Sequence, residues 1–171
     1  MGGTATATAT RLPLDPVPDT ELGRLYRFWY DRLVEGAPPT VRSIRPEELR
    51  FMLGRVNLVD VLDGPQFRYR LVGTKIATVG GGDMQGQLVS ALKPAVFARV
   101  VESHLFMALA EQAPNLHEMV VSRGTIVRRY HRLVLPYAPE PGSGCIGAMM
   151  TGTWYNEDIV EVLGHPDFSA G

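Results

Sequence analysis

The chain has 171 residues, of which 45% are apolar and 20% are charged, and its formal net charge is −1. A chain of this size can bury a self-sufficient core, as one domain or as one domain with extensions. The near-zero net charge gives no overall electrostatic attraction to nucleic acid or to anionic membranes. No apolar stretch is long enough for a membrane helix and no secretory leader is recognisable, so we expect a cytoplasmic location.

The first eighteen residues form a lead. Alanine and threonine alternate over residues 4–10, and three prolines follow by residue 18. Because such a segment buries little surface, residues 1–18 are predicted to be disordered or extended. Residues 19–45 are predicted to form a helix and a linker, since Asp19 and Thr20 favour a helix start. The apolar stripe of this helix consists of Leu22, Leu25, Tyr26, Trp29, Leu33 and Val34.

Residues 46–156 are predicted to form the core of the domain, and residues 157–171 a C-terminal turn and tail. The apolar pattern changes from helical to alternating at residue 56, which indicates strands. The predicted strands cover residues 56–62, 67–71, 117–122, 125–137 and 145–155. Between the second and third strands lie short helices over 74–79 and 87–92 and a long helix over 94–113. Antiparallel strands on either side of a helical block predict an α+β fold.

Two strands, a helical block and three strands is also the order of the PAS fold. The segment LGRVNLVDVLDGPQFRYRLVGTKIATVGG at residues 53–81 resembles the first half of a PAS-like family common in alphaproteobacteria. The segment RRYHRLVLPYAPE at residues 128–140 is similar to a later strand of that family. The resemblance implies a five-stranded antiparallel sheet with helices on one face, an N-terminal helical extension, and a pocket between sheet and helices.

The resemblance also implies a function. Such a domain is a small-molecule-sensing or protein-interaction module without catalytic activity, acting in bacterial signalling through association with a partner. Two alternatives stay open. A small enzyme on a cone-shaped α+β fold would need polar groups that converge in the pocket, above all a carboxylate or a histidine. An adaptor without a ligand would have a filled core.

Candidate pocket residues combine strand positions of one parity with the apolar stripe of the long helix. They are Tyr69, Leu71, Phe97, Val101, Leu105, Leu133, Leu135 and Met149. Their side chains predict a small apolar ligand, and no catalytic residue is assigned. Tyr26, Trp29 and Tyr30 load the first helix with aromatic surface. This helix either packs on the free face of the sheet or contacts a second subunit or a signalling partner, and we expect a homodimer.

The cofactor is left open. His104 lies on the long helix and could ligate haem, but a lone histidine on a partly apolar helix is common in proteins without haem. Cys145 is the only cysteine, so it can form neither an intramolecular disulfide nor a zinc cluster within one chain. It lacks the sequence context of flavin-binding light sensors and is interpreted as a small buried apolar residue. No histidine pair has metal-ligand spacing on one helix, so no metal site is predicted.

Arginine is concentrated on the predicted strands. The positions are Arg68, Arg70, Arg123, Arg128, Arg129 and Arg132. These side chains could bind an acidic partner or the head group of an anionic ligand. A solvated strand face with crossed ion pairs is the simpler interpretation and is the one we favour.

Overall fold

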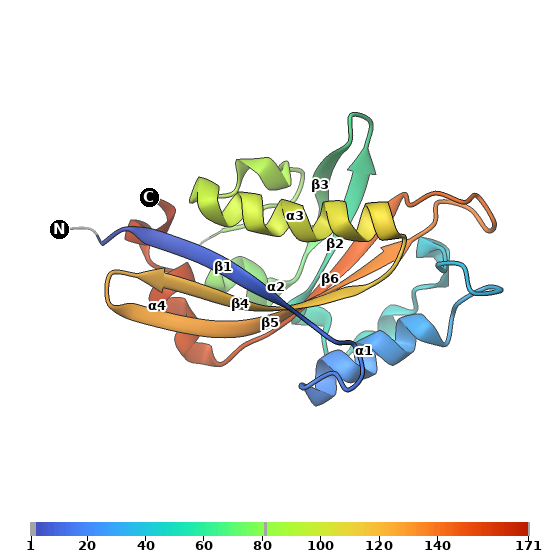
Figure 1. The fold of residues 1–171 in the computed structure, drawn as a ribbon, viewed down its shortest axis with the longest axis horizontal. Coiled ribbons are helices and arrows are strands. Elements are labelled where there is room, and N and C mark those ends of the chain that lie inside the picture. Colours follow the sequence, from blue (N-terminus) through green and yellow to red (C-terminus); the bar gives the residue numbers. More distant parts are fainter. Residues whose placement is uncertain (1–2, 81, 171) are drawn as a thin grey trace.

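The computed structural model of the chain describes residues 3–80 and 82–170. Over these residues one antiparallel sheet holds six strands in the order β1-β4-β5-β6-β2-β3. The strands are β1 (Ala5–Leu12), β2 (Val56–Leu62), β3 (Gln66–Val72), β4 (Asn115–Arg123), β5 (Ile126–Tyr137) and β6 (Ala148–Trp154). The α-helices are α1 (Thr20–Tyr30), α2 (Thr74–Val79), α3 (Ala95–Glu111), α4 (Val160–Leu163) and α5 (Pro166–Ser169). Figure 1 shows how these elements are arranged, and the α+β class is as the sequence predicted.

The sheet has one strand more than the five that were expected. The additional strand is β1, which pairs with β4 along its whole length, from Ala5 opposite Arg123 to Leu12 opposite Leu116. The alternation of alanine and threonine has the period of a strand, and the alanines at positions 5 and 7 are buried on the inner face. A segment with so little apolar surface becomes a strand because the outer edge of β4 offers backbone groups that pair with it.

The hairpin of β2 and β3 is followed by a tight crossing of the backbone. Gly73 comes directly after β3, and a Cβ atom there would lie 2.5 Å from the carbonyl oxygen of Gly54 and 2.8 Å from that of Val56. Backbone atoms cannot move aside without displacing β2 or the turn that leads into it. The glycine of the LVGT segment therefore allows α2 to begin close against the start of β2.

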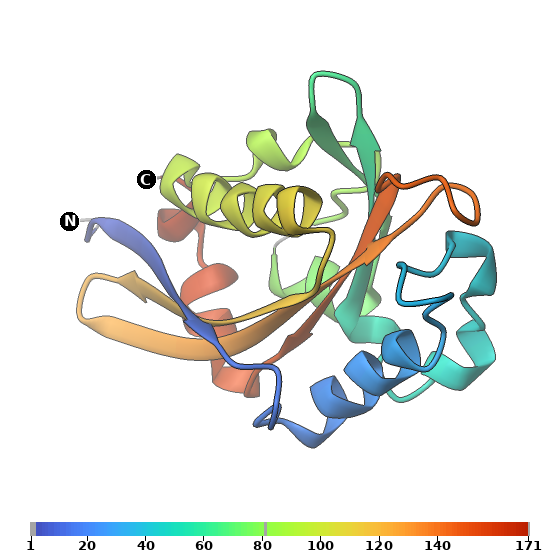
Figure 2. The ribbon, with the colours of Figure 1, turned by 45° about the vertical axis from the view of Figure 1, so that its right-hand side comes forward.

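Helices cover both faces of the sheet. The helix α3 contacts β1, β4 and β5 on one face, and α1 contacts β5 and β6 on the other. Figure 2 shows α3 and α1 on opposite sides of the strands. The C-terminal helices pack on the α3 face, where Val162 and Phe168 join a cluster with Phe97. Strand β5 serves both faces in turn: Leu133 and Leu135 pack with the residues of α1, whereas Val134 packs with those of α3.

The first helix packs within its own chain. Leu22 and Leu25 are fully buried, and the indole Nε1 of Trp29 donates a hydrogen bond of 2.7 Å to the carbonyl oxygen of Pro136. A Cβ atom on Gly152 of β6 would lie 2.4 Å from a terminal methyl group of Leu25, so the helix lies directly on the sheet. Of the two arrangements considered for this helix, the structure shows packing on the open face of the sheet.

Candidate functional site

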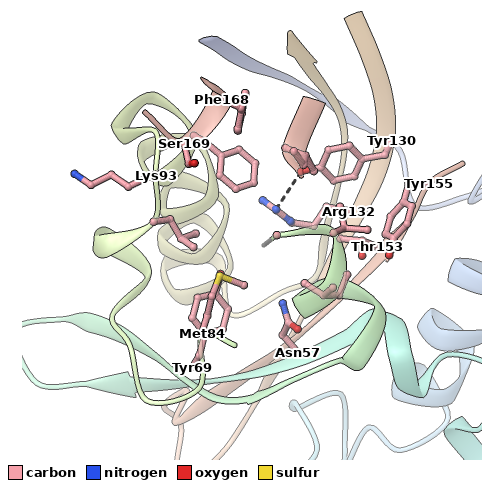
Figure 3. Close-up of a pocket in the computed structure, with 16 residues that line it drawn as sticks. Asn57, Tyr69, Met84, Lys93, Tyr130, Arg132, Thr153, Tyr155, Phe168 and Ser169 are labelled. Atoms are coloured by element: carbon pink, nitrogen blue, oxygen red, sulfur yellow. Dashed lines mark hydrogen bonds between the residues drawn. The ribbon is translucent and has the colours of Figure 1, made fainter. Parts of the chain in front are cut away.

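A cavity of about 90 Å³ lies between the sheet and the helices of the α3 face. Its volume suits a few water molecules or a small organic ligand. The strand side is formed by Asn57, Tyr69, Tyr130, Arg132, Thr153 and the adjacent Tyr155. The helical side is formed by Ile76, Val79, Gly80, Met84, Leu92, Lys93, Phe97, Leu163, Phe168 and Ser169. Figure 3 shows these side chains converging from the two layers.

The sheet side of the cavity is polar although it is buried. Asn57, Arg132 and Thr153 are 7%, 7% and 6% exposed. The side-chain oxygen of Asn57 accepts a 3.0 Å hydrogen bond from the backbone N–H of Gly73, which fixes the orientation of the amide. The helical side is mainly apolar. The cavity therefore has one face that can form hydrogen bonds and one that offers van der Waals contact, as many ligand sites do.

Arg132 brings a permanent positive charge to the sheet side of the cavity. Its Nη2 donates to the hydroxyl oxygen of Tyr130 at 3.3 Å. Its buried Nη1 has no hydrogen-bond partner in residues 3–80 and 82–170. In Figure 3 the guanidinium points from β5 into the space between the two layers. Within the same residues no carboxylate oxygen lies within 4.0 Å of it. The positive charge thus faces the cavity without an anionic partner from the described chain.

Three phenols line the cavity in their neutral form, and two of them, Tyr69 and Tyr130, feel the charge of Arg132. Burial raises the pKa of Tyr69 to about 12, against a smaller opposing effect of the nearby Arg132 charge. Burial also raises the pKa of Tyr130 and of Tyr155. All three hydroxyls keep their protons at neutral pH. The hydroxyl of Tyr155 is buried without a partner in the described chain, so it can donate a hydrogen bond to a ligand.

A pair of histidines lies beside the cavity and does not line it. The rings of His104 and His117 are stacked, with centroids 3.6 Å apart and planes 9° from parallel. Burial lowers the pKa of His104 to about 2 and that of His117 to about 4, and the charge of Arg132 acts in the same direction. Both rings are therefore neutral at physiological pH. His104, considered above for haem ligation, packs on another imidazole outside the cavity lining.

The predicted pocket residues separate into three groups. Tyr69 and Phe97 line the cavity. Val101, Leu105 and Met149 belong to the packed core next to it on the same face of the sheet. The other three candidates do not lie at the cavity.

Leu133 and Leu135 point to the opposite face, where they pack with α1. Both faces of β5 are apolar, so alternation alone could not show which parity faces the cavity. Leu71 is 50% exposed because of a register shift between Leu58 and Val59. The irregularity leaves one extra residue on β3 and turns Leu71 outward, after Phe67 and Tyr69 have both pointed inward.

The residues predicted to contact a partner differ in exposure. Trp29 is 4% exposed and is held in its own chain, whereas Tyr30 is 55% exposed. Tyr26 is half-buried and its ring stacks on that of Trp29, with centroids 6.3 Å apart. Cys145 is exposed in the loop before β6, contrary to the expectation of a buried residue, because the strand begins only at Ala148.

The strand arginines confirm the ion-pair interpretation at several positions and contradict it at one. Arg70 pairs with Asp60, Arg128 with Glu161, and Arg129 with Glu118. Arg132 instead is buried at the cavity. Apart from Arg132, which was considered for an anionic head group, sequence reasoning missed the polar or aromatic lining residues Asn57, Lys93, Tyr130, Thr153, Tyr155, Phe168 and Ser169. The only available signal was that Tyr130 and Arg132 share a parity on β5.

The lining offers no acid–base pair. Among the described residues that form it there is no carboxylate, imidazole or thiol. No group of three or more His, Cys, Asp or Glu residues is arranged to hold a metal ion in the described part of the chain. The arrangement places a cation, neutral phenols and an amide opposite an apolar wall.

A six-stranded antiparallel sheet, with a helical block over a cavity on one face, defines the class of protein as an α+β domain of the PAS arrangement. A family model described as PAS domain matches residues 19–150, more than half of the chain. The chain therefore belongs to the PAS domain family, whose members are sensory or interaction modules. Neither the curated proteins nor the solved structures contain a significant match. No helix in residues 3–80 and 82–170 is long and apolar enough to cross a membrane.

Proposed function

We propose that this PAS domain is a small-molecule sensor or protein-interaction module without catalytic activity, which acts in bacterial signalling in the cytoplasm through association with a partner. The observation that carries the proposal is the cavity between the sheet and the helical block, with a buried, unpaired polar group at its sheet side. A cavity that served only packing would be lined by apolar atoms, because an unpartnered buried polar group costs stability.

Ligand binding would act on the helical side of the cavity. Phe97 of α3 and Phe168 of α5 meet edge to face, with ring centroids 5.9 Å apart, and both line the cavity. A ligand that contacts these rings would favour one placement of α5 relative to α3 through its differential affinity for the two placements. The C-terminal segment is thus the part of the described chain that is best positioned to report occupancy.

Native mass spectrometry of the protein purified from its host tests the proposal. We expect a reproducible adduct that disappears on denaturation. Met84→Trp, which places an indole at the cavity from a loop, should remove the adduct. Val127→Trp, at an exposed position of β5, should retain it. If the unmodified protein carries no adduct, and if no compound of a small-molecule library stabilises it against heat, the results would favour the adaptor without a ligand.

The homodimer is a separate proposal. Tyr30 is the most exposed large apolar residue of the described chain, and it adjoins Tyr26 at a ring-centroid distance of 6.0 Å. Exposed aromatic side chains are enriched at protein interfaces. We expect sedimentation velocity at tens of micromolar to give a dimer that Tyr30→Ser weakens. A monomer at that concentration contradicts the proposal.

The enzyme alternative is weaker because the described lining contains no carboxylate, imidazole or thiol. Its phenols have raised pKa values, and its guanidinium does not release a proton near neutral pH. Turnover of any compound that also binds in the cavity, lost in Tyr155→Phe, would revive the alternative.

A further inference from the structure

We propose that the cavity binds a small monocarboxylate whose carboxylate group pairs with the guanidinium of Arg132. This inference rests on the proposed sensing function and specifies the chemical class of the ligand. It starts from one observation. A side chain that is 7% exposed, and that carries a permanent positive charge, has a buried nitrogen atom without a partner in the described residues.

A buried charge is stable in a protein only when opposite charge and hydrogen bonds compensate for its lost hydration. The described chain supplies little of either to Arg132. The hydroxyl of Tyr130 accepts one hydrogen bond, and its length of 3.3 Å makes it a weak one. The guanidinium carbon lies 5.8 Å from the ring centroid of Phe97 and 5.9 Å from that of Tyr130, near the limit for cation–π attraction. The missing compensation is an anion in the cavity.

The charge count favours a monoanion. Lys93 is the other cation of the lining, but it is exposed and its ammonium group points away from the cavity in Figure 3. The interior therefore holds one positive charge. A carboxylate would neutralise it through the paired N–H groups that guanidinium presents. A phosphate dianion would leave a second negative charge without a partner in a buried site.

The other residues of the cavity lining indicate the size and polarity of the rest of the ligand. The hydroxyl of Tyr155 can donate a hydrogen bond, and it has no other partner in the described chain. The opposite wall is apolar and includes Ile76, Val79, Leu92, Phe97, Leu163 and Phe168. A cavity of about 90 Å³ accommodates only a small molecule. A short aliphatic or single-ring monocarboxylate fits this combination.

The test uses matched acid and amide probes on the full chain. Butyrate, hexanoate and benzoate are compared with butyramide, hexanamide and benzamide by thermal shift and by ligand-observed NMR. We expect at least one acid to bind at least tenfold more tightly than its amide. In Arg132→Met that acid should lose at least tenfold in affinity. In Arg129→Met, which changes an exposed arginine of the same strand, it should bind as in the unmodified protein. Unfolding curves for each variant show whether the comparison concerns folded protein.

The outcomes separate this inference from the proposed function. Equal binding of acids and amides, undiminished in Arg132→Met, would overturn the carboxylate assignment and leave a sensing cavity of another chemistry. Failure of all three acids to bind, with only ordered water at Nη1 of Arg132 in a crystal soaked with benzoate, would overturn it as well. Preference for phenyl phosphate over benzoate would replace the carboxylate by a phosphate. The host-purified protein in native mass spectrometry tests sensing independently of these probes.

Discussion

The two faces of the sheet are built differently. On the face of α1 the buried residues are almost all apolar and fill the space between helix and strands. On the face of α3 the buried set includes the polar residues Asn57, His104, Asn115, His117, Arg132, Thr151 and Thr153. That face also contains the cavity. One strand serves both purposes, since consecutive residues of β5 point to opposite faces. The α1 face is packed throughout, whereas the α3 face combines two packed apolar clusters with a partly polar cavity.

The contrast between the two faces is clearest at Arg132 and Leu133, which are adjacent in sequence but point to different faces of the sheet. Leu133 is fully buried among the residues packed under α1. The comparison predicts that changes on the α1 face alter the free energy of unfolding, whereas changes at the cavity alter binding. The four predictions below test it, from the largest expected effect to the smallest.

Leu133→Ala should lower the free energy of unfolding by about 3 kcal/mol, because it leaves a cavity in a tightly packed region. The affinity for the carboxylate probe should not change. Denaturant unfolding measures the loss, and Leu71→Ala serves as a control. Leu71 is 50% exposed, so its truncation should cost less than about 1 kcal/mol. A loss of similar size in both variants would contradict the difference in packing.

The histidine pair should make the α3 face sensitive to acid. The pKa values of His104 and His117 fall from 6.5 to about 2 and about 4 on folding. Below pH 6.5 the unfolded chain therefore binds protons that the folded chain does not, and stability decreases as the pH falls from 6.5 toward 4. We expect His117 alone to account for about 2–3 kcal/mol over this range, at about 1.4 kcal/mol per pKa unit.

The measurement is the free energy of unfolding at pH 7 and at pH 4.5, for the unmodified protein and for His117→Phe. Phenylalanine keeps a flat ring against His104 and removes one titrating group. The variant should lose less stability between the two pH values. Equal losses in the two proteins would mean that other groups govern the acid sensitivity.

Arg132→Met should raise the free energy of unfolding by about 1 kcal/mol when no ligand is present, because an unpaired buried charge is replaced by an apolar chain of similar length. Chemical denaturation of protein refolded from denaturant, which removes any carried ligand, gives the comparison. A decrease of more than about 1 kcal/mol would show that Arg132 stabilises the fold, and the site would then be structural.

Tyr155→Phe and Tyr137→Phe should each change stability by less than about 0.5 kcal/mol, since both hydroxyls are buried without a partner in the described chain. The two variants should differ in binding. Tyr155 lines the cavity and Tyr137 packs on the α1 face, so only Tyr155→Phe should weaken the carboxylate probe, by several-fold. Titration calorimetry with the same acid provides the measurement, and equal affinities would remove Tyr155 from the site.

Much of the fold was accessible from the sequence. The strands at 56–62 and 126–137, the helix at 74–79 and the long helix lie within a few residues of the expected positions, because their apolar periods and turn residues are strong local signals. At two places the local sequence pattern did not predict the observed structure. The Ala/Thr segment has the period of a strand but too little apolar surface to indicate one, and Cys145 was placed in a strand that starts three residues later.

The site was less accessible. Tyr69 and Phe97 were found because they lie on clearly amphipathic elements, whereas Leu133 and Leu135 were assigned to the wrong face of β5. A strand that is buried on both sides shows no difference between its two parities, so the sequence cannot tell which one meets the ligand. The bulge that turns Leu71 outward also has no signature in the sequence.

The sequence by itself determined the order of the main elements after β1, the α+β class and the membership of a PAS-like family, since these depend on local periodicity and on short motifs. Tertiary structure decided which face of the sheet is filled and which is hollow. It placed Trp29 within its own chain, and it directed the Asp19 side chain to His131 of β5 instead of to the backbone of α1. Above all, it buried Arg132 without an anion from the described chain. A charged residue on a strand has the same local preferences whether it is solvated or buried, and only the packing of distant segments makes the difference.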